Sequence, residues 1–188
     1  MAIQRLRCEW SGIGQVGPGL STFYAEADGT QAIASAAAAL FEAVKNVIPS
    51  GGSVQVPAQG DILDETTGEL VGVWGSGPTT TVTMTGSQAH AAGVGARVVW
   101  NTAGIVAGRR VRGATFLVPL GNASFDGTGT LVPTALTPIT AGITAFLAQA
   151  GGNAVVWSRP ADGRVGSAHP IVSGNVPDKV SWLRSRRT

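Results

Sequence analysis

The sequence predicts an α+β domain in which two helices cover antiparallel sheets, and three observations support this fold class. Residues 28–48 and 137–150 each repeat apolar side chains at helical spacing. About nine short segments alternate apolar and polar residues or are rich in β-branched residues, as strands are. The order strand, strand, helix, Gly-Gly, strand occurs in residues 7–57 and again in residues 97–160. We therefore expect one domain over residues 1–188, with a pseudo-two-fold axis relating two ββαβ units.

The first unit is predicted to begin with two strands. Residues 3–10 alternate apolar and polar side chains, as a half-buried strand does. The loop that follows contains Pro18, which prevents regular pairing, and residues 20–25 form the second strand. Asp28 and Gln31 then have the capping-box spacing that starts a helix.

This first helix is expected to have one apolar face and a defined end. Its buried side chains fall three or four residues apart and are Ile33, Ala37, Leu40, Phe41, Val44 and Ile48. Pro49 and the pair Gly51-Gly52 stop the helix, because neither proline nor this glycine pair continues it well.

Further strands are expected between the two units. Residues 54–56 form a short strand, and residues 62–74 form a hairpin around the polar turn 64–68. The threonine-rich residues 79–85 form another strand. The buried side chains of that strand are expected to be Val82 and Met84.

The second unit is predicted to repeat this order. Residues 97–101 and 109–120 are two strands, and residues 121–133 form a polar, glycine-rich surface loop. Thr137-Pro138 opens the second helix, where the missing N–H of proline has no cost. The buried stripe of this helix is Ile139, Ile143, Phe146, Leu147 and Ala150. The remaining predicted strands are residues 154–158, 170–173 and 180–183.

The internal repeat is predicted from matching positions in the two units. The matches are Trp10 with Trp100, Phe23 with Phe116, Leu40-Phe41 with Phe146-Leu147, and Gly51-Gly52 with Gly151-Gly152. Chance similarity between two segments rich in glycine and valine is the competing interpretation. A duplicated unit without a catalytic constellation is more typical of a building block than of an enzyme.

The charge is divided unevenly along the chain, although the formal net charge is only +2. Residues 1–94 carry three basic and eight acidic residues, whereas residues 95–188 carry ten basic and three acidic residues. Opposite charge on the two halves suits pairing within the chain or head-to-tail contact between subunits.

The sequence contains no recognisable metal motif. His90 and His169 are far apart, and neither has a partner at the spacing that metal ligands use. An acidic cluster lacks the spacing of a calcium-binding loop and is explained more simply by a hairpin turn. Its members are Asp61, Asp64, Glu65 and Glu69.

Enzymatic motifs are also missing from the sequence. No serine lies in a Gly-x-Ser-x-Gly elbow, and the glycine-rich segments lack the Gly-Lys-Ser/Thr of a phosphate loop. Cys8, the single cysteine, is expected to be a small apolar residue in or beside the first strand rather than a nucleophile. We therefore predict a protein that is not an enzyme and that binds no metal or cofactor.

Arginine and tryptophan side chains are the candidate site residues, because both types contribute strongly to interfaces. Three arginines open the strand predicted at 109–120, and three more lie near the end of the sequence. The candidates for subunit contact or phosphate contact are Arg109, Arg110, Arg112, Arg184, Arg186, Arg187, Trp100 and Trp182. The competing interpretation is that these arginines belong to a solvated strand end and a solvated tail, and that they keep the protein soluble.

Two segments resemble parts of small structural proteins of bacteriophage virions. These segments are Gly108-Arg109-Arg110-Val111-Arg112-Gly113-Ala114-Thr115-Phe116-Leu117-Val118-Pro119-Leu120, and Val176-Pro177-Asp178-Lys179-Val180 with the closing Arg184-Ser185-Arg186-Arg187. The resemblance implies a virion component of the capsid or tail that is present in many copies. It carries no defined set of binding residues onto this chain.

We therefore predict a viral structural protein that assembles with itself and with other virion proteins. Nucleic acid is a further candidate partner, which these short basic stretches support only weakly. No apolar stretch has the length and composition of a signal peptide or a membrane span. We therefore expect the protein to be synthesised in the host cytoplasm and to be located in the virion. The alternatives are a carbohydrate- or receptor-binding module of a virion or cell surface and, less favoured, a small hydrolase.

Overall fold

The computed structural model describes residues 2–12, 19–26, 32–64, 67–88, 95–101, 105–106, 109–110, 115–150, 153–160 and 166–172. The elements of the first half are β1 (Ala2–Ser11), β2 (Leu20–Glu26), α1 (Ala32–Val44), β3 (Ser53–Val56), β4 (Gly60–Asp64), β5 (Leu70–Trp74) and β6 (Thr80–Thr83). The elements of the second half are β7 (Gly95–Asn101), β8 (Ile105–Val106), β9 (Arg109–Arg110), β10 (Thr115–Pro119), the 3₁₀ helix η2 (Asn122–Ser124), α2 (Pro133–Ala150), β11 (Asn153–Arg159) and β12 (Ala168–Val172).

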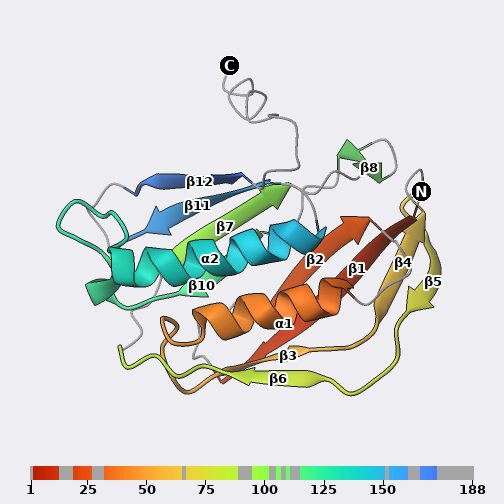
Figure 1. The fold of residues 1–188 in the computed structure, drawn as a ribbon, viewed down its shortest axis with the longest axis horizontal. Coiled ribbons are helices and arrows are strands. Elements are labelled where there is room, and N and C mark those ends of the chain that lie inside the picture. The colour runs from red at the N-terminus through yellow and green to blue at the C-terminus, as the bar shows by residue number, and fades with distance from the viewer. Residues whose placement is uncertain are drawn as a thin grey trace.

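The described strands form three antiparallel sheets (Figure 1). The six-stranded sheet has the order β5-β4-β1-β3-β6, with β2 on the opposite edge of β1, and it curls into a half-barrel. The four-stranded sheet has the order β10-β7-β11-β12, and β8 pairs with β9. The helices α1 and α2 lie side by side over the two larger sheets (Figure 1). The predicted α+β class with two covering helices is confirmed.

The two predicted units have the same pattern of strand pairing. β1 pairs with β2 on one edge and with β3 on the other, and β7 pairs with β10 and β11 in the same way. In each unit a helix connects the second strand to the third. A duplicated unit would produce this shared topology, and duplication of the sequence itself stays a prediction.

The strand registers agree with the predicted match of the two tryptophans. Trp10 faces Val54 in the first unit, and Trp100 faces Ala154 in the second. Val54 lies two residues after Gly51-Gly52, and Ala154 lies two residues after Gly151-Gly152. Each tryptophan therefore faces the same position of its own unit. The sequence match therefore places both central strands in the correct register.

The predicted match of Phe23 with Phe116 is two residues out of register. Phe23 faces Leu6, which lies four residues before Trp10. In the second unit, Ala96 lies four residues before Trp100, and it faces Val118. Val118 is therefore the structural equivalent of Phe23, and both side chains are fully buried. A shift of two residues keeps the same face of a strand inward, so the apolar pattern alone does not reveal it.

The hydrophobic core lies between the helices and the inner faces of the two larger sheets, and it draws side chains from both units. Phe23 on β2 packs against Phe146 on α2 and Phe41 on α1, with ring centroids 5.2 and 5.8 Å apart. β2 and β10 also contact each other, although they belong to different sheets. Side-chain packing therefore joins the two sheets at this seam.

Helix α1 has the predicted buried face, and α2 has a different start from the predicted one. All six expected side chains of the first apolar face are buried, from Ile33 to Ile48, although the helix ends at Val44. α2 begins at Pro133, one turn before Thr137-Pro138. Pro133 occupies the first helical position, where no N–H is needed, and Pro138 lies inside the helix. Residues 28–31 lie outside the described part of the chain.

Two predictions for residues 109–133 are corrected by the structure. Residues 109–120 do not form one strand, because β9 pairs with β8 whereas β10 pairs with β7 in another sheet. The segment 121–133 is not a simple surface loop, because Phe125 and Leu131 are buried and form a β-bridge. The described part of the chain contains twelve strands rather than about nine, and the strand expected at 180–183 lies outside it.

Candidate functional site

A pocket of about 300 Å³ opens on the edge of β1 where its partner strand changes from β3 to β4. Glu9 faces Gln55, and Arg5 faces Asp61. The three residues of β1 between Arg5 and Glu9 therefore lie opposite five residues, Val56–Gly60. Pro57 lies in this longer segment and has no N–H to continue the ladder. The extra residues bulge away from β1, and this bulge creates the pocket.

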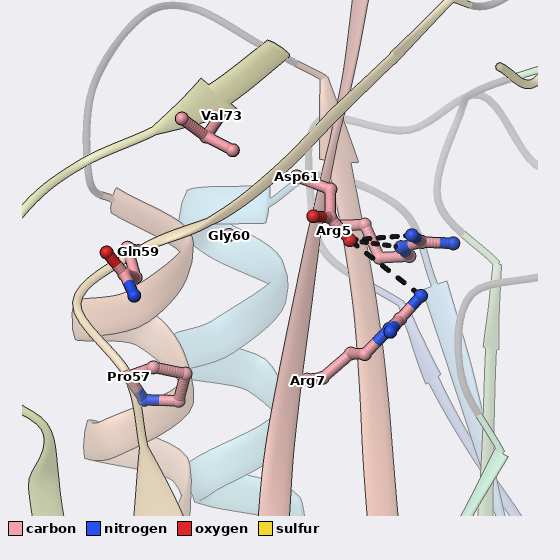
Figure 2. Close-up of a pocket in the computed structure, with 7 residues that line it drawn as sticks. All are labelled: Arg5, Arg7, Pro57, Gln59, Gly60, Asp61 and Val73. Carbon is pink, nitrogen blue, oxygen red and sulfur yellow. Dashed lines mark hydrogen bonds and ion pairs between the residues drawn. The ribbon is translucent and has the colours of Figure 1, made fainter. Parts of the chain in front are cut away.

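Charged side chains define one wall of the pocket. The guanidinium of Arg5 donates two hydrogen bonds to Oδ2 of Asp61, at 2.8 Å from Nε and 2.6 Å from Nη2. Arg7 is half exposed, and its Nη2 lies 3.8 Å from the same carboxylate oxygen. Figure 2 shows the Asp61 carboxylate directed toward both arginines, with Pro57 and Gln59 on the other side of the pocket. Two guanidinium groups and one carboxylate give this wall a formal charge of +1.

Glycine is required at the floor of the pocket. A Cβ on Gly60 would collide with the carbonyl oxygen of Arg5 and lie 2.7 Å from the ring of Trp74. Trp74 is the last residue of β5, and its buried ring lies against Gly60, which it faces on β4. The backbone of β4 can approach β1 here only because residue 60 has no side chain.

The pocket adjoins an exposed strand edge, which we call the β5 edge and define by Leu70, Val71 and Val73. These three side chains expose 60%, 61% and 73% of their surface. Val73 also lines the pocket and faces Asp61 on β4. β5 pairs with β4 alone among the described strands, so its other edge has free backbone groups. The pairing is irregular between Ile62 and Leu63, as at a β-bulge.

The structure places three of the candidate arginine and tryptophan residues in strands. Arg110 faces Ile105 and Arg109 faces Val106 in the two-stranded ladder of β8 and β9. Trp100 faces Ala154 between β7 and β11, so the structure does not bring it into the same sheet as the two arginines. The other candidates lie outside the described residues, and these are Arg112, Arg184, Arg186, Arg187 and Trp182.

Sequence reasoning did not identify the residues of the pocket or of the β5 edge as site residues. The β5 edge has one signal in the sequence, since Leu-Val-Gly-Val-Trp is an apolar run without the alternation of a half-buried strand. The pocket has no such signal, because it depends on how β1 aligns with two distant segments.

The acidic cluster of the β4–β5 hairpin is divided among structural roles. Asp61 pairs with Arg5, and Oδ1 of Asp64 accepts a hydrogen bond from the backbone N–H of Thr67 at 2.8 Å. Glu69 is exposed, and Glu65 lies outside the described residues. Within the described part of the chain, no group of three or more His, Cys, Asp or Glu side chains could hold a metal ion.

A serine–histidine contact lies near the end of the four-stranded sheet. Oγ of Ser167 is 3.2 Å from Nε2 of His169 and 3.2 Å from Oγ of Ser158. The Ser158 hydroxyl donates to the carbonyl oxygen of Gly129 at 2.9 Å, in a buried position. These bonds fasten the segment before α2 to β11, and none of the three side chains lines the pocket.

The structure places Cys8 where the sequence predicted it. Its side chain is fully buried in the core on β1, and burial raises the pKa of the thiol to about 12. A protonated, inaccessible thiol is a poor nucleophile. The pocket lining offers a carboxylate, an amide and guanidinium groups, which suit binding of an anionic group better than covalent catalysis.

None of the helices in the described part of the chain is both long and apolar enough to cross a membrane. Comparison of the chain with protein-family models, curated proteins and solved structures finds no match.

Proposed function

We propose that this chain is a structural protein of a bacteriophage virion, a capsid or tail component that assembles with copies of itself. The observation that carries this proposal is the β5 edge, where three large apolar side chains are exposed beside backbone groups that pair with no described strand. Strand edges of monomeric proteins are commonly protected by charged residues, especially lysine, or by proline. The sequence of β5 contains none of these, which favours an edge that is covered by another subunit.

The charge distribution supports the same proposal. Eight of the eleven acidic residues lie in residues 1–94, and ten of the thirteen basic residues lie in residues 95–188. Contact between the first half of one copy and the second half of another would therefore be electrostatically favourable. A stable interface buries roughly 1,200–2,000 Å² in total, so the β5 edge would form one part of a larger contact.

The proposal is tested by measuring the mass of the purified protein. Light scattering over a range of concentrations, at low and high salt, should detect oligomers, and negative-stain electron microscopy should show rings, tubes or shells. High salt should weaken assembly, because it screens the attraction between oppositely charged surfaces. A monomer at every concentration and salt level would overturn the proposal.

A substitution on the β5 edge makes the test specific. Val71→Lys places a charge on the exposed apolar surface, and we expect the concentration for half-assembly to rise about tenfold, or ~1.4 kcal/mol. Leu20→Lys is the matched control, because Leu20 is 46% exposed on β2. Equal effects of the two substitutions would show that the β5 edge has no special role.

A carbohydrate- or receptor-binding module is the second candidate function, and Trp157 favours it. Its side chain is 44% exposed on β11, whereas Trp10 and Trp74 are buried. An exposed indole ring can stack on a sugar ring. Saturable glycan binding by a protein that stays monomeric would favour this function over assembly.

A further inference from the structure

We infer that the β8–β9 hairpin of one copy adds to the β5 edge of a neighbouring copy and extends its six-stranded sheet. The inference rests on the proposed function, since it requires that copies assemble, and it names the two surfaces that meet. Strand addition would satisfy the free backbone groups of β5 and cover its apolar side chains.

The β5 side of this contact is acidic. Residues 60–75 contain Asp61, Asp64, Glu65 and Glu69 and no lysine or arginine. Arg5 and Arg7 offset the charge of Asp61 on the pocket wall, so the acidic character of this side comes from the rest of the hairpin, where Glu69 is exposed directly before β5. The charge next to the open edge therefore favours a basic occupant.

The β8–β9 hairpin has the complementary composition. β9 consists of Arg109 and Arg110, and residues 102–114 also include Arg112 and no acidic residue. β8 consists of the apolar residues Ile105 and Val106. A segment that combines apolar and basic residues matches an edge that combines apolar and acidic ones.

The hairpin also has structural reason to pair further. β8 and β9 form a two-stranded sheet that joins no other described strand, and Figure 1 shows β8 apart from the two larger sheets. An isolated two-stranded ladder is marginally stable in water, and pairing with a larger sheet would stabilise it. Pairing of β5 with β5 of a second copy would instead bring two acidic hairpins together, which is less favourable.

Cysteine cross-linking tests the contact directly. One copy carries Val71→Cys, a second copy with a different affinity tag carries Val106→Cys, and the mixture is oxidised under assembly conditions. We expect a disulfide between differently tagged chains. Leu20→Cys mixed with Val106→Cys is the negative control. The native Cys8 is buried and should not react.

A charge exchange provides an independent test. Glu69→Lys and Arg110→Glu should each raise the concentration for half-assembly about threefold to tenfold. The two substitutions together in one chain should restore that concentration to within about twofold of wild type, because the pair keeps opposite charges across the interface. Circular dichroism should show that each variant stays folded.

The outcomes separate this inference from the proposed function. If wild-type protein assembles but Val71→Cys cross-links to itself, or to nothing, the inference is wrong and the proposed function stands. Failure of the charge exchange to restore assembly would also overturn the inference. If wild-type protein stays monomeric under all conditions, the proposed function fails first.

Discussion

Trp10 and Trp74 are both buried but differ in one hydrogen bond. Nε1 of Trp10 donates to Oγ of the buried Ser21 at 2.8 Å, whereas Nε1 of Trp74 has no partner among the described residues. A buried polar group without a partner costs about 1–3 kcal/mol. The same substitution at the two positions should therefore have unequal effects.

We predict that Trp10→Phe destabilises the protein by about 1–3 kcal/mol more than Trp74→Phe. The first substitution removes a hydrogen bond and leaves the Ser21 hydroxyl unpaired, whereas the second removes an unpaired donor. Urea unfolding of both variants measures the difference in the free energy of unfolding. Equal losses would contradict this account.

The burial of Cys8 predicts a dependence of stability on alkaline pH. Burial raises the pKa of the thiol from 9.0 to about 12, so the unfolded chain releases this proton at lower pH than the folded chain does. The contribution of Cys8 to stability is complete below pH 9.0 and is lost as the pH rises toward 12, by up to about 1.4 kcal/mol per pH unit.

We therefore expect wild-type protein to lose stability more steeply above pH 9.0 than the variant Cys8→Ala. Denaturant unfolding at several pH values on either side of this point measures both slopes. Parallel curves for the two proteins would mean that the thiol titrates normally in the folded state.

At the scale of elements, the contact between α1 and α2 depends on a glycine. A Cβ on Gly142 would lie 3.0 Å from both Cβ of Ala43 and Cδ1 of Leu40, closer than side chains normally pack. The absence of a side chain at Gly142 therefore sets how closely the two helices approach.

We predict that Gly142→Leu destabilises the protein by about 1–3 kcal/mol, because the larger side chain would push the helices apart. Ala145→Leu is the matched control, since residue 145 is exposed on the same helix. Thermal unfolding should show a lower midpoint for the first variant and little change for the second. A neutral Gly142→Leu would mean that the helix pair repacks freely.

Local sequence patterns predict most helices and strands correctly. The elements that are predicted wrongly depend on pairing between distant segments. The apolar face of α1 follows from spacing within one segment, and all its members are buried. The sequence misplaces the start of α2 because Pro133 and Pro138 both suit an early helical turn. The sequence predicts one strand over residues 109–120 because Phe116 and Val118 alternate with a polar face, although β9 and β10 pair with different partners.

At the scale of the whole molecule, the candidate site is less predictable than the fold. The pocket exists because Pro57 bulges from a ladder whose partner strand lies about fifty residues away in the sequence. The arginines of β9 can be named from the sequence, but their pairing with β8 apart from the larger sheets cannot. Such relationships depend on register between distant segments, which composition does not encode.

The seam between β2 and β10 has a mechanical consequence. The two strands belong to separate sheets in the described structure and meet through packing around Phe23 and Phe146. Side-chain contacts can slide by small amounts, whereas a backbone ladder must break to shift register. A small tilt of one sheet against the other would therefore shift side-chain contacts without breaking a described strand ladder. If copies assemble as proposed, a seam of this kind would let one chain fit neighbouring positions of unequal curvature.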